Sequence, residues 1–254
     1  MSSSDDLSQK KENHQENSED QTKVNTIKTA LDTSCTFSAL KEIGYMDKYE
    51  KLPQLKFEES SEVEFSDAVP IKRSKYNTVA SDNSHYYFTT SREVIRLEKY
   101  DFHKGVQLTD FFSDNGWHVF TSHSTSEGLG FGTLCILDSI TSLKYEIVSI
   151  NDWNVQTPSL SSDGKYLIYY DNYTYQHKNC FIGVVKVNEN QRENNNKYLV
   201  EYTSYESNDW AIEELRWIDS STIIIKGYDE KYINGKWEKQ FKYIKTSLNL
   251  LNKA

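Results

Sequence analysis

A three-residue phrase that occurs twice constrains the fold of this chain more than any other feature. Asn151-Asp152-Trp153 is followed, ten residues after its tryptophan, by the turn Asp163-Gly164 and a strand-like run. Asn208-Asp209-Trp210 is followed at the same distance by the turn Asp219-Ser220-Ser221 and another apolar run. The two copies lie 57 residues apart, and such a period is typical of β units stacked side by side. Because repeats share scaffold positions, we interpret each phrase as a turn followed by a packed tryptophan.

The chain contains four segments with a common layout. A turn rich in Asp, Asn, Ser or Gly precedes an apolar strand, and a second strand follows after a polar loop, which is the pattern of a β-hairpin. The expected strand pairs are 85–89 with 94–97, 117–121 with 131–137, 166–170 with 181–187, and 223–226 with 241–244. Further strands are expected at 145–150, 198–202 and 212–218.

The third unit carries the clearest motif. Its phrase Ser161-Ser162-Asp163-Gly164-Lys165-Tyr166-Leu167 resembles the turn between the first two strands of a blade in TolB-like and WD-repeat β-propellers. It departs from that pattern at Ser162, where those blades usually have proline, and no Gly-His…Trp-Asp signature is present. The resemblance covers about ten residues and implies a blade-like hairpin.

These patterns predict an all-β fold built from repeated antiparallel hairpin units. The units form a small or incomplete propeller-like assembly, and a β-sandwich is the alternative. Residues 1–25 are polar and are expected to be a disordered tail. Residues 26–56 have partial helical spacing, with good helix material at 38–42, and are expected to form a short helical segment. The β-repeat domain is expected to span 57–254.

The charge of the chain bears on its partners. The net charge is −9, which disfavours nucleic acid and anionic membranes, because both need clustered Lys and Arg. A protein with a basic surface would suit it better. No apolar run is long enough to cross a membrane. Read from Met1, the protein is expected to be cytoplasmic; a trimmed periplasmic lipoprotein is the alternative, because the start is a Ser- and Asp-rich tether.

The sequence lacks the usual motifs of catalytic, metal-binding and nucleotide-binding sites. His118 and His123 are five residues apart on one expected strand, so they point to opposite faces and do not form a metal site. The glycines of 128–132 precede a strand rather than a helix, which disfavours a nucleotide loop. Cys135 and Cys180 lack a CxxC context and would pair only in an exported protein. The sequence therefore predicts no catalytic residue, no metal and no cofactor.

Aromatic side chains are the best candidates for a binding surface, because interfaces are rich in Tyr and Trp. They crowd three places, the hairpin after the Asp-Gly turn, the loop before the fourth unit and the last hairpin. The candidate partner-binding residues are Tyr170, Tyr173, Tyr175, Tyr205, Tyr228, Asp229, Glu230, Tyr232 and Trp237. For any one of them, the covering of a half-exposed strand is the competing explanation.

Three hypotheses of function follow from these observations. The main one is a non-catalytic protein-binding module, in a specific version a bacterial immunity or inhibitor protein that occludes a partner toxin. The first alternative is a lipid-tethered periplasmic protein that binds a sugar or a peptide. The second alternative is a hydrolase whose carboxylates converge from different blades, which requires a pocket that holds two or more acids.

Overall fold

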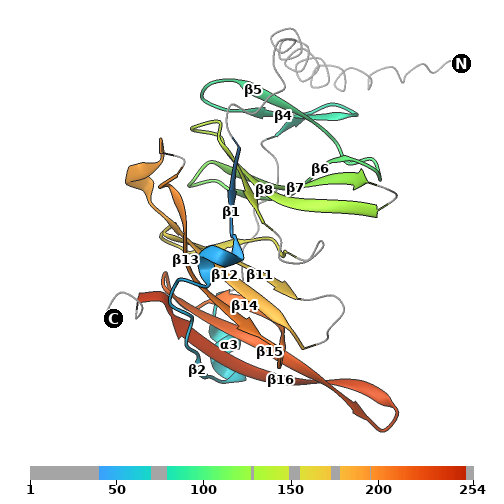
Figure 1. Ribbon diagram of the computed structural model, residues 1–254, viewed down its shortest axis with the longest axis vertical. Coiled ribbons are helices and arrows are strands. Elements are labelled where there is room, and N and C mark those ends of the chain that lie inside the picture. Colours follow the sequence, from blue (N-terminus) through green and yellow to red (C-terminus); the bar gives the residue numbers. More distant parts are fainter. Residues whose placement is uncertain are drawn as a thin grey trace, which may run out of the picture.

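The computed structural model describes residues 40–69, 79–126, 129–148, 155–172, 178–194 and 196–249. These residues form four small sheets in which nearly all strands are antiparallel, arranged one after another along the long axis of the molecule (Figure 1). The prediction of an all-β fold is thus confirmed. The expected tail 1–25 and the first copy of the repeated phrase lie outside the described residues.

The first two sheets are built mainly from consecutive strands. The first sheet has the order β3 (Ala80–Ser81), β4 (His85–Thr89) and β5 (Val94–Glu98). The second sheet has the order β1-β9-β8-β7-β6. Its strands are β1 (Leu40–Ile43), β6 (Gly105–Phe112), β7 (Trp117–Ser126), β8 (Leu129–Asp138) and β9 (Lys144–Ile147).

The other two sheets follow the same plan. The third sheet consists of β10 (Ser159–Leu160), β11 (Tyr166–Asn172), β12 (Cys180–Val187) and β13 (Leu199–Ser207). The fourth sheet consists of β14 (Ala211–Trp217), β15 (Thr222–Ile233), β16 (Lys236–Ser247) and β2 (Glu58–Glu59). All four predicted hairpins are therefore present as β4–β5, β7–β8, β11–β12 and β15–β16.

Alternating side chains pack each sheet against its neighbours. On β11, Leu167 and Tyr169 enter the core shared with the second sheet, whereas Tyr166 and Ile168 enter the core shared with the fourth. A third core joins the first and second sheets through residues such as Phe88. Because successive side chains of a strand point to opposite faces, a central sheet can be buried on both sides. None of the described core clusters joins the first sheet to the fourth, so the described sheets form an open series.

The two cysteines of the β-region fall into different cores. Cys135 packs between the first and second sheets, and Cys180 packs between the third and fourth. Both are buried free thiols. The pairing considered for an exported protein is therefore absent.

The segment 40–69 crosses the outer edges of three sheets, as the blue and cyan ribbon of Figure 1 shows. β1 pairs in parallel with β9, Leu55 donates its backbone N–H to Ser204 O at 2.9 Å, and β2 pairs with β16. The expected helix at 38–42 is wrong where it can be judged, because Leu40–Ile43 is a strand. The helices here are α2 (Met46–Tyr49) and α3 (Glu62–Asp67), whose N-cap Ser61 accepts from Glu64 N.

The second copy of the repeated phrase serves the scaffold. Trp210 is 3% exposed, its ring stacks on Tyr205 at 5.8 Å, and Phe57 meets it edge-on at 6.3 Å. A Cβ on Gly227 would lie 2.8 Å from the Trp210 ring, so this glycine leaves room for the indole. The tryptophan therefore packs as the repeat predicted.

A buried histidine gives the fold a dependence on pH. His118 is 6% exposed and lies between Phe88 and Phe111, with ring centroids 5.1 and 4.7 Å away. Burial lowers the pKa of His118 to about 4 from 6.5. The unfolded chain thus takes up a proton more readily than the folded one as pH falls below 6.5. Stability should be fully present above that pH and decline by about 3 kcal/mol as pH falls to 4.

This decline can be measured by urea unfolding at neutral pH and near pH 4. In His118→Leu, which has no ring to protonate, the fall in unfolding free energy should be smaller than in the wild-type protein by that amount. Equal falls in the two proteins would show that His118 does not cause the pH dependence.

Candidate functional site

A pocket lies where β6, β10 and β14, an edge strand from each of three sheets, end. Its volume is about 690 Å³. The second sheet contributes residues 111–115, the third contributes 159–164 and the fourth contributes 217–219. Val69, Glu189 and Arg192 complete the lining. Three of the turns that the sequence pattern identified, at 113–116, 161–164 and 219–221, thus meet at one place.

Local turn chemistry positions the polar lining. Gly116 and Gly164 have φ angles of +64° and +70°, which a residue with a Cβ adopts only with strain. Ser161 Oγ donates to Asp163 Oδ1 at 2.8 Å, and Asp219 Oδ1 accepts the backbone N–H groups of Ser221 and Thr222 at 2.7 and 2.8 Å. Such side chain to backbone bonds are the reason that Asp and Ser favour turns.

Two of the pocket carboxylates are held in the anionic form. Partial burial would raise the pKa of Asp163, but hydrogen bonds from Lys165 and Ser161 outweigh it and the pKa is lowered. The same balance lowers the pKa of Asp219, whose bonds come from Ser221 and Thr222. The pocket therefore keeps negative charge at neutral pH.

Charge compensation within the pocket is uneven. Asp163 has an ion pair with Lys165 at 2.9 Å, and Glu189 has one with Arg192 at 3.3 Å. Asp114 accepts only from Ser113 Oγ, at 3.2 Å, and Asp219 accepts only neutral donors, among the interactions of the described residues. Aromatic and aliphatic side chains form the remaining walls, namely Phe111, Phe112, Leu160, Trp217 and Ile218.

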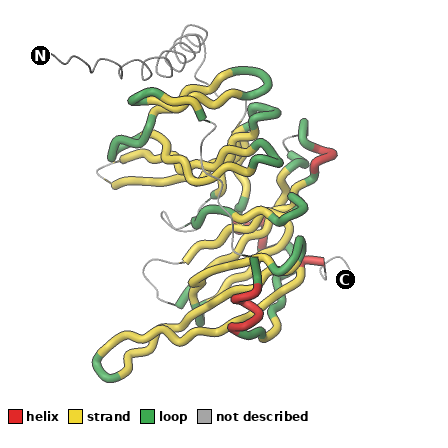
Figure 2. Tube along the Cα trace, turned by 180° about the vertical axis from the view of Figure 1, so that it is seen from behind, coloured by secondary structure: helices red, strands yellow, loops and turns green. Residues whose placement is uncertain are grey.

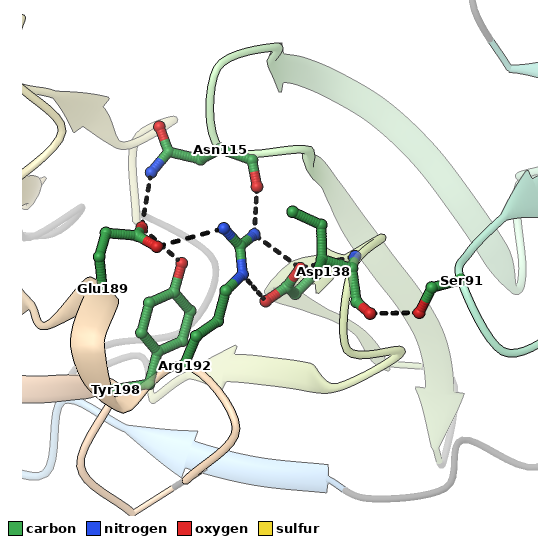
Figure 3. Close-up of polar contacts among 7 residues, drawn as sticks. Ser91, Asn115, Asp138, Glu189, Arg192 and Tyr198 are labelled. Carbon is green, nitrogen blue, oxygen red and sulfur yellow. Dashed lines mark hydrogen bonds and ion pairs between the residues drawn. The ribbon is translucent and has the colours of Figure 1, made fainter.

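A buried ion pair forms one side of the pocket and ties two sheets together (Figure 3). Arg192 follows the 3₁₀ helix η1 (Glu189–Gln191) of the third sheet and reaches Asp138 at the end of β8. Its Nε and Nη2 donate to the two carboxylate oxygens at 2.9 and 2.8 Å, and Asp138 is fully buried. A planar guanidinium suits this two-bond geometry.

Neighbouring groups complete this cluster. Arg192 also donates to the backbone carbonyl of Asn115, and Asn115 Nδ2 donates to Glu189 at 3.2 Å. Tyr198 OH donates to the same Glu189 oxygen at 3.0 Å. Arg192, Asp138, Asn115, Glu189 and Tyr198 are called the inter-sheet clamp below. The first sheet is attached beside it, because Ser91 Oγ donates to the carbonyl of Ile140 (Figure 3).

The sequence-predicted aromatic residues lie elsewhere. Tyr170 and Tyr205 flank Ile182 in the third sheet and pack on the core shared with the fourth sheet. Tyr228, Glu230, Tyr232 and Trp237 share one face of the β15–β16 hairpin, and Asp229 is on the other face, paired with Lys178 at 2.9 Å. Tyr173 and Tyr175 fall outside the described residues. None of the described ones lines the pocket.

Sequence reasoning identified the pocket turns as scaffold and missed that they converge. Asp114, Asp163 and Asp219 each occur in a readable turn motif, and this was the available signal. Arg192 had no such signal, because it lies in a polar loop. Within the described residues, no group of three or more His, Cys, Asp or Glu side chains could hold a metal ion. No helix among them has the length and apolar character needed to cross a membrane.

Comparisons with known proteins place the chain far from established families. No family model matches it, and no curated protein does. Two solved structures resemble it, a mutant puromycin hydrolase complexed with PGG at a TM-score of 0.39 and puromycin hydrolase at 0.38. Each is 12% identical over 68% of this chain and 30% of the other, so the chain spans less than a third of these proteins.

These comparisons correct the main hypothesis of function. Both structures are of a hydrolase and neither is an inhibitor or immunity protein, so the interpretation as a non-catalytic protein-binding module is wrong on these findings. The alternative of a hydrolase with converging carboxylates agrees with them better. A likeness at this TM-score transfers no activity. The pocket is the feature of the chain from which a function can be inferred.

Proposed function

We propose that the pocket binds a small organic cation with an apolar part. One observation carries the proposal: Asp114 and Asp219 border a pocket with aromatic walls, and neither has an ion pair among the described residues. An ammonium or guanidinium group would compensate these carboxylates. The apolar part would displace water from Phe111, Phe112 and Trp217.

The charges of the lining support this choice over an anionic ligand. The cations of the pocket region are already engaged, Lys165 with Asp163 and Arg192 with Asp138 and Glu189. An anionic ligand would have to break one of these pairs, whereas a cation would gain partners without breaking any. Burial of the ligand would strengthen the attraction, because the effective dielectric of a pocket is lower than that of water.

The proposal predicts that Asp114→Asn weakens the binding of a cationic probe by about tenfold to a hundredfold, because hydrogen bonds to charged groups contribute about 1.5–3 kcal/mol. Isothermal titration calorimetry with benzylamine and phenylguanidine measures this, with benzyl alcohol as the neutral analogue. Asp47→Asn is the matched control, since Asp47 is exposed and outside the pocket. Equal affinities for benzylamine and benzyl alcohol, or an undiminished affinity in Asp114→Asn, would overturn the proposal.

Hydrolysis of such a ligand is a second candidate function. It is favoured by the origin of the carboxylates, which come to one pocket from three different sheets. The lowered pKa values of Asp163 and Asp219 suit binding or base roles and not a general acid. Asp114, which has no ion pair among the described residues, is the carboxylate to test in the reaction. Steady release of benzylamine from its amides, lost in Asp114→Asn, would support hydrolysis, and binding without turnover would leave only the first function.

A further inference from the structure

The β15–β16 hairpin extends beyond the sheet to which it belongs. The two strands stay in register from Thr222 and Ser247 to Ile233 and Lys236. Pairing with β14 ends at Tyr228, and β2 pairs only with Ile244 and Lys245. The outer part, 229–242, therefore has no further strand beside it in the described structure, and both views show it projecting from the body (Figures 1 and 2). Side chains from Lys236 to Lys242 are all exposed.

The tip of this hairpin exposes aromatic rings on one face and carries a half-buried isoleucine on the other. Tyr232 and Trp237 are 63% and 66% exposed and face each other across the strands, with ring centroids 5.4 Å apart. Ile233, one residue further, points to the opposite face. Asn234 and Gly235 make the tight turn, with φ angles of +51° and +84°. The tip therefore presents exposed aromatic rings beside the turn at which the projection ends.

The hairpin also carries a local excess of positive charge. Between Lys226 and Tyr243 there are five lysines and three carboxylates, although the whole chain has a net charge of −9. One of the three carboxylates, Asp229, is paired with Lys178, and one of the five lysines, Lys239, is paired with Glu213. Lys226 lies over the Phe241 ring at 4.1 Å and Lys239 over Tyr228 at 4.0 Å. The expectation from the total charge, which disfavours an anionic membrane, does not apply to this projection.

We infer that the hairpin tip inserts into the interface of an anionic lipid bilayer. Trp and Tyr favour the level of the lipid headgroups, where the ring meets apolar chains and the polar tip meets water. Lysines near them attract anionic lipids and can extend their charged ends toward the headgroups. The projection of the tip from the acidic body keeps the other carboxylates away from the surface. This inference is independent of the function proposed for the pocket.

Co-sedimentation of the full chain with lipid vesicles tests the inference. Vesicles of phosphatidylcholine alone are compared with an equal mixture of phosphatidylcholine and phosphatidylglycerol. Binding is expected only to the mixture, and at low salt more than at high salt. The double variant Tyr232→Ala, Trp237→Ala should lower the partition coefficient by tenfold or more. Lys231→Gln with Lys236→Gln should lower it by about fivefold for each lysine. Matched controls are Phe102→Ala, whose ring is 79% exposed, and Lys51→Gln with Lys197→Gln.

Fluorescence gives a second readout. Trp117, Trp210 and Trp217 are buried, and Trp153 lies outside the described residues. A blue shift of emission on adding anionic vesicles should be absent in Trp237→Phe and kept in Trp153→Phe. The inference would be overturned by a lack of binding to either vesicle, by equal binding to both, or by a loss in the control variants equal to that in the tip variants. Self-association of the chain that disappears in the tip variants, without vesicle binding, would assign the tip to a second copy instead.

Discussion

Replacement of Arg192 by methionine should lower the free energy of unfolding by about 3–5 kcal/mol, because it leaves Asp138 charged and unpaired in the interior. Asp138 is fully buried, and Arg192 supplies two of its hydrogen bonds at 2.9 and 2.8 Å. Among the described residues, the other donor to the carboxylate is the backbone N–H of Ile140 at 2.8 Å. One neutral bond does not replace a bidentate guanidinium.

A double-mutant cycle separates the coupling energy of the ion pair from the other destabilising effects of each substitution. The double variant Arg192→Met, Asp138→Asn should lose much less unfolding free energy than the two single variants lose when added together. The reason is that the buried charge is removed together with its partner. Arg92→Met is the matched control, since Arg92 pairs with Glu193 at 3.1 Å on the surface and should change the unfolding free energy by less than about 1 kcal/mol. Chemical denaturation measures all four variants. Additive single effects would contradict the role of the clamp as an ion pair.

Truncation of Trp210 to alanine should cost about 3–5 kcal/mol, the range for large aromatic side chains in cores. The indole is 3% exposed and contacts Tyr205 and Phe57, so its removal leaves a cavity between the third and fourth sheets. The indole ring packs closely against Gly227, and a side chain at that position would overlap it. Gly227→Ala should therefore destabilise as well, by about 1–3 kcal/mol through overpacking.

Trp237→Ala provides the matched control for this prediction. It deletes the same side chain from a position that is 66% exposed and should change stability by about half a kcal/mol at most. Thermal and urea unfolding of the two variants can be compared directly. If both tryptophan variants lost the same stability, the second copy of the repeated phrase would not be a packing element.

The sequence predicted the hairpins well because their signals are local. Asp163-Gly164 and its counterparts need positive φ or side-chain acceptors in a turn, and these requirements are met within a few residues. The strand Leu40–Ile43 was not predicted, since its helical preference is overridden by the edge of β9 far along the chain. The short segment shows how tertiary pairing decides between states of similar local energy.

The site was less predictable than the fold. Asp114, Asp163 and Asp219 could each be assigned to a turn, but their meeting in one pocket depends on the stacking of three sheets. For the aromatic residues the prediction erred in the other direction, because it placed partly buried side chains on the surface. Tyr170 and Tyr205 looked like surface residues, yet they are partly buried against a core, because the alternation of a strand does not reveal whether a neighbouring sheet covers its face.

The path of segment 40–69 has a consequence for how the chain is made. β1 pairs with β9 and β2 pairs with β16, so the segment is fully paired only when both of these later strands have been made. During synthesis the edges of β1 and β2 stay unpaired until these partners have been made, which is the condition under which strands pair with the wrong chain. Because β9 is made well before β16, the segment would be paired first with the second sheet and last with the fourth. Kinetic vulnerability of the protein should therefore be concentrated in its assembly more than in its finished state.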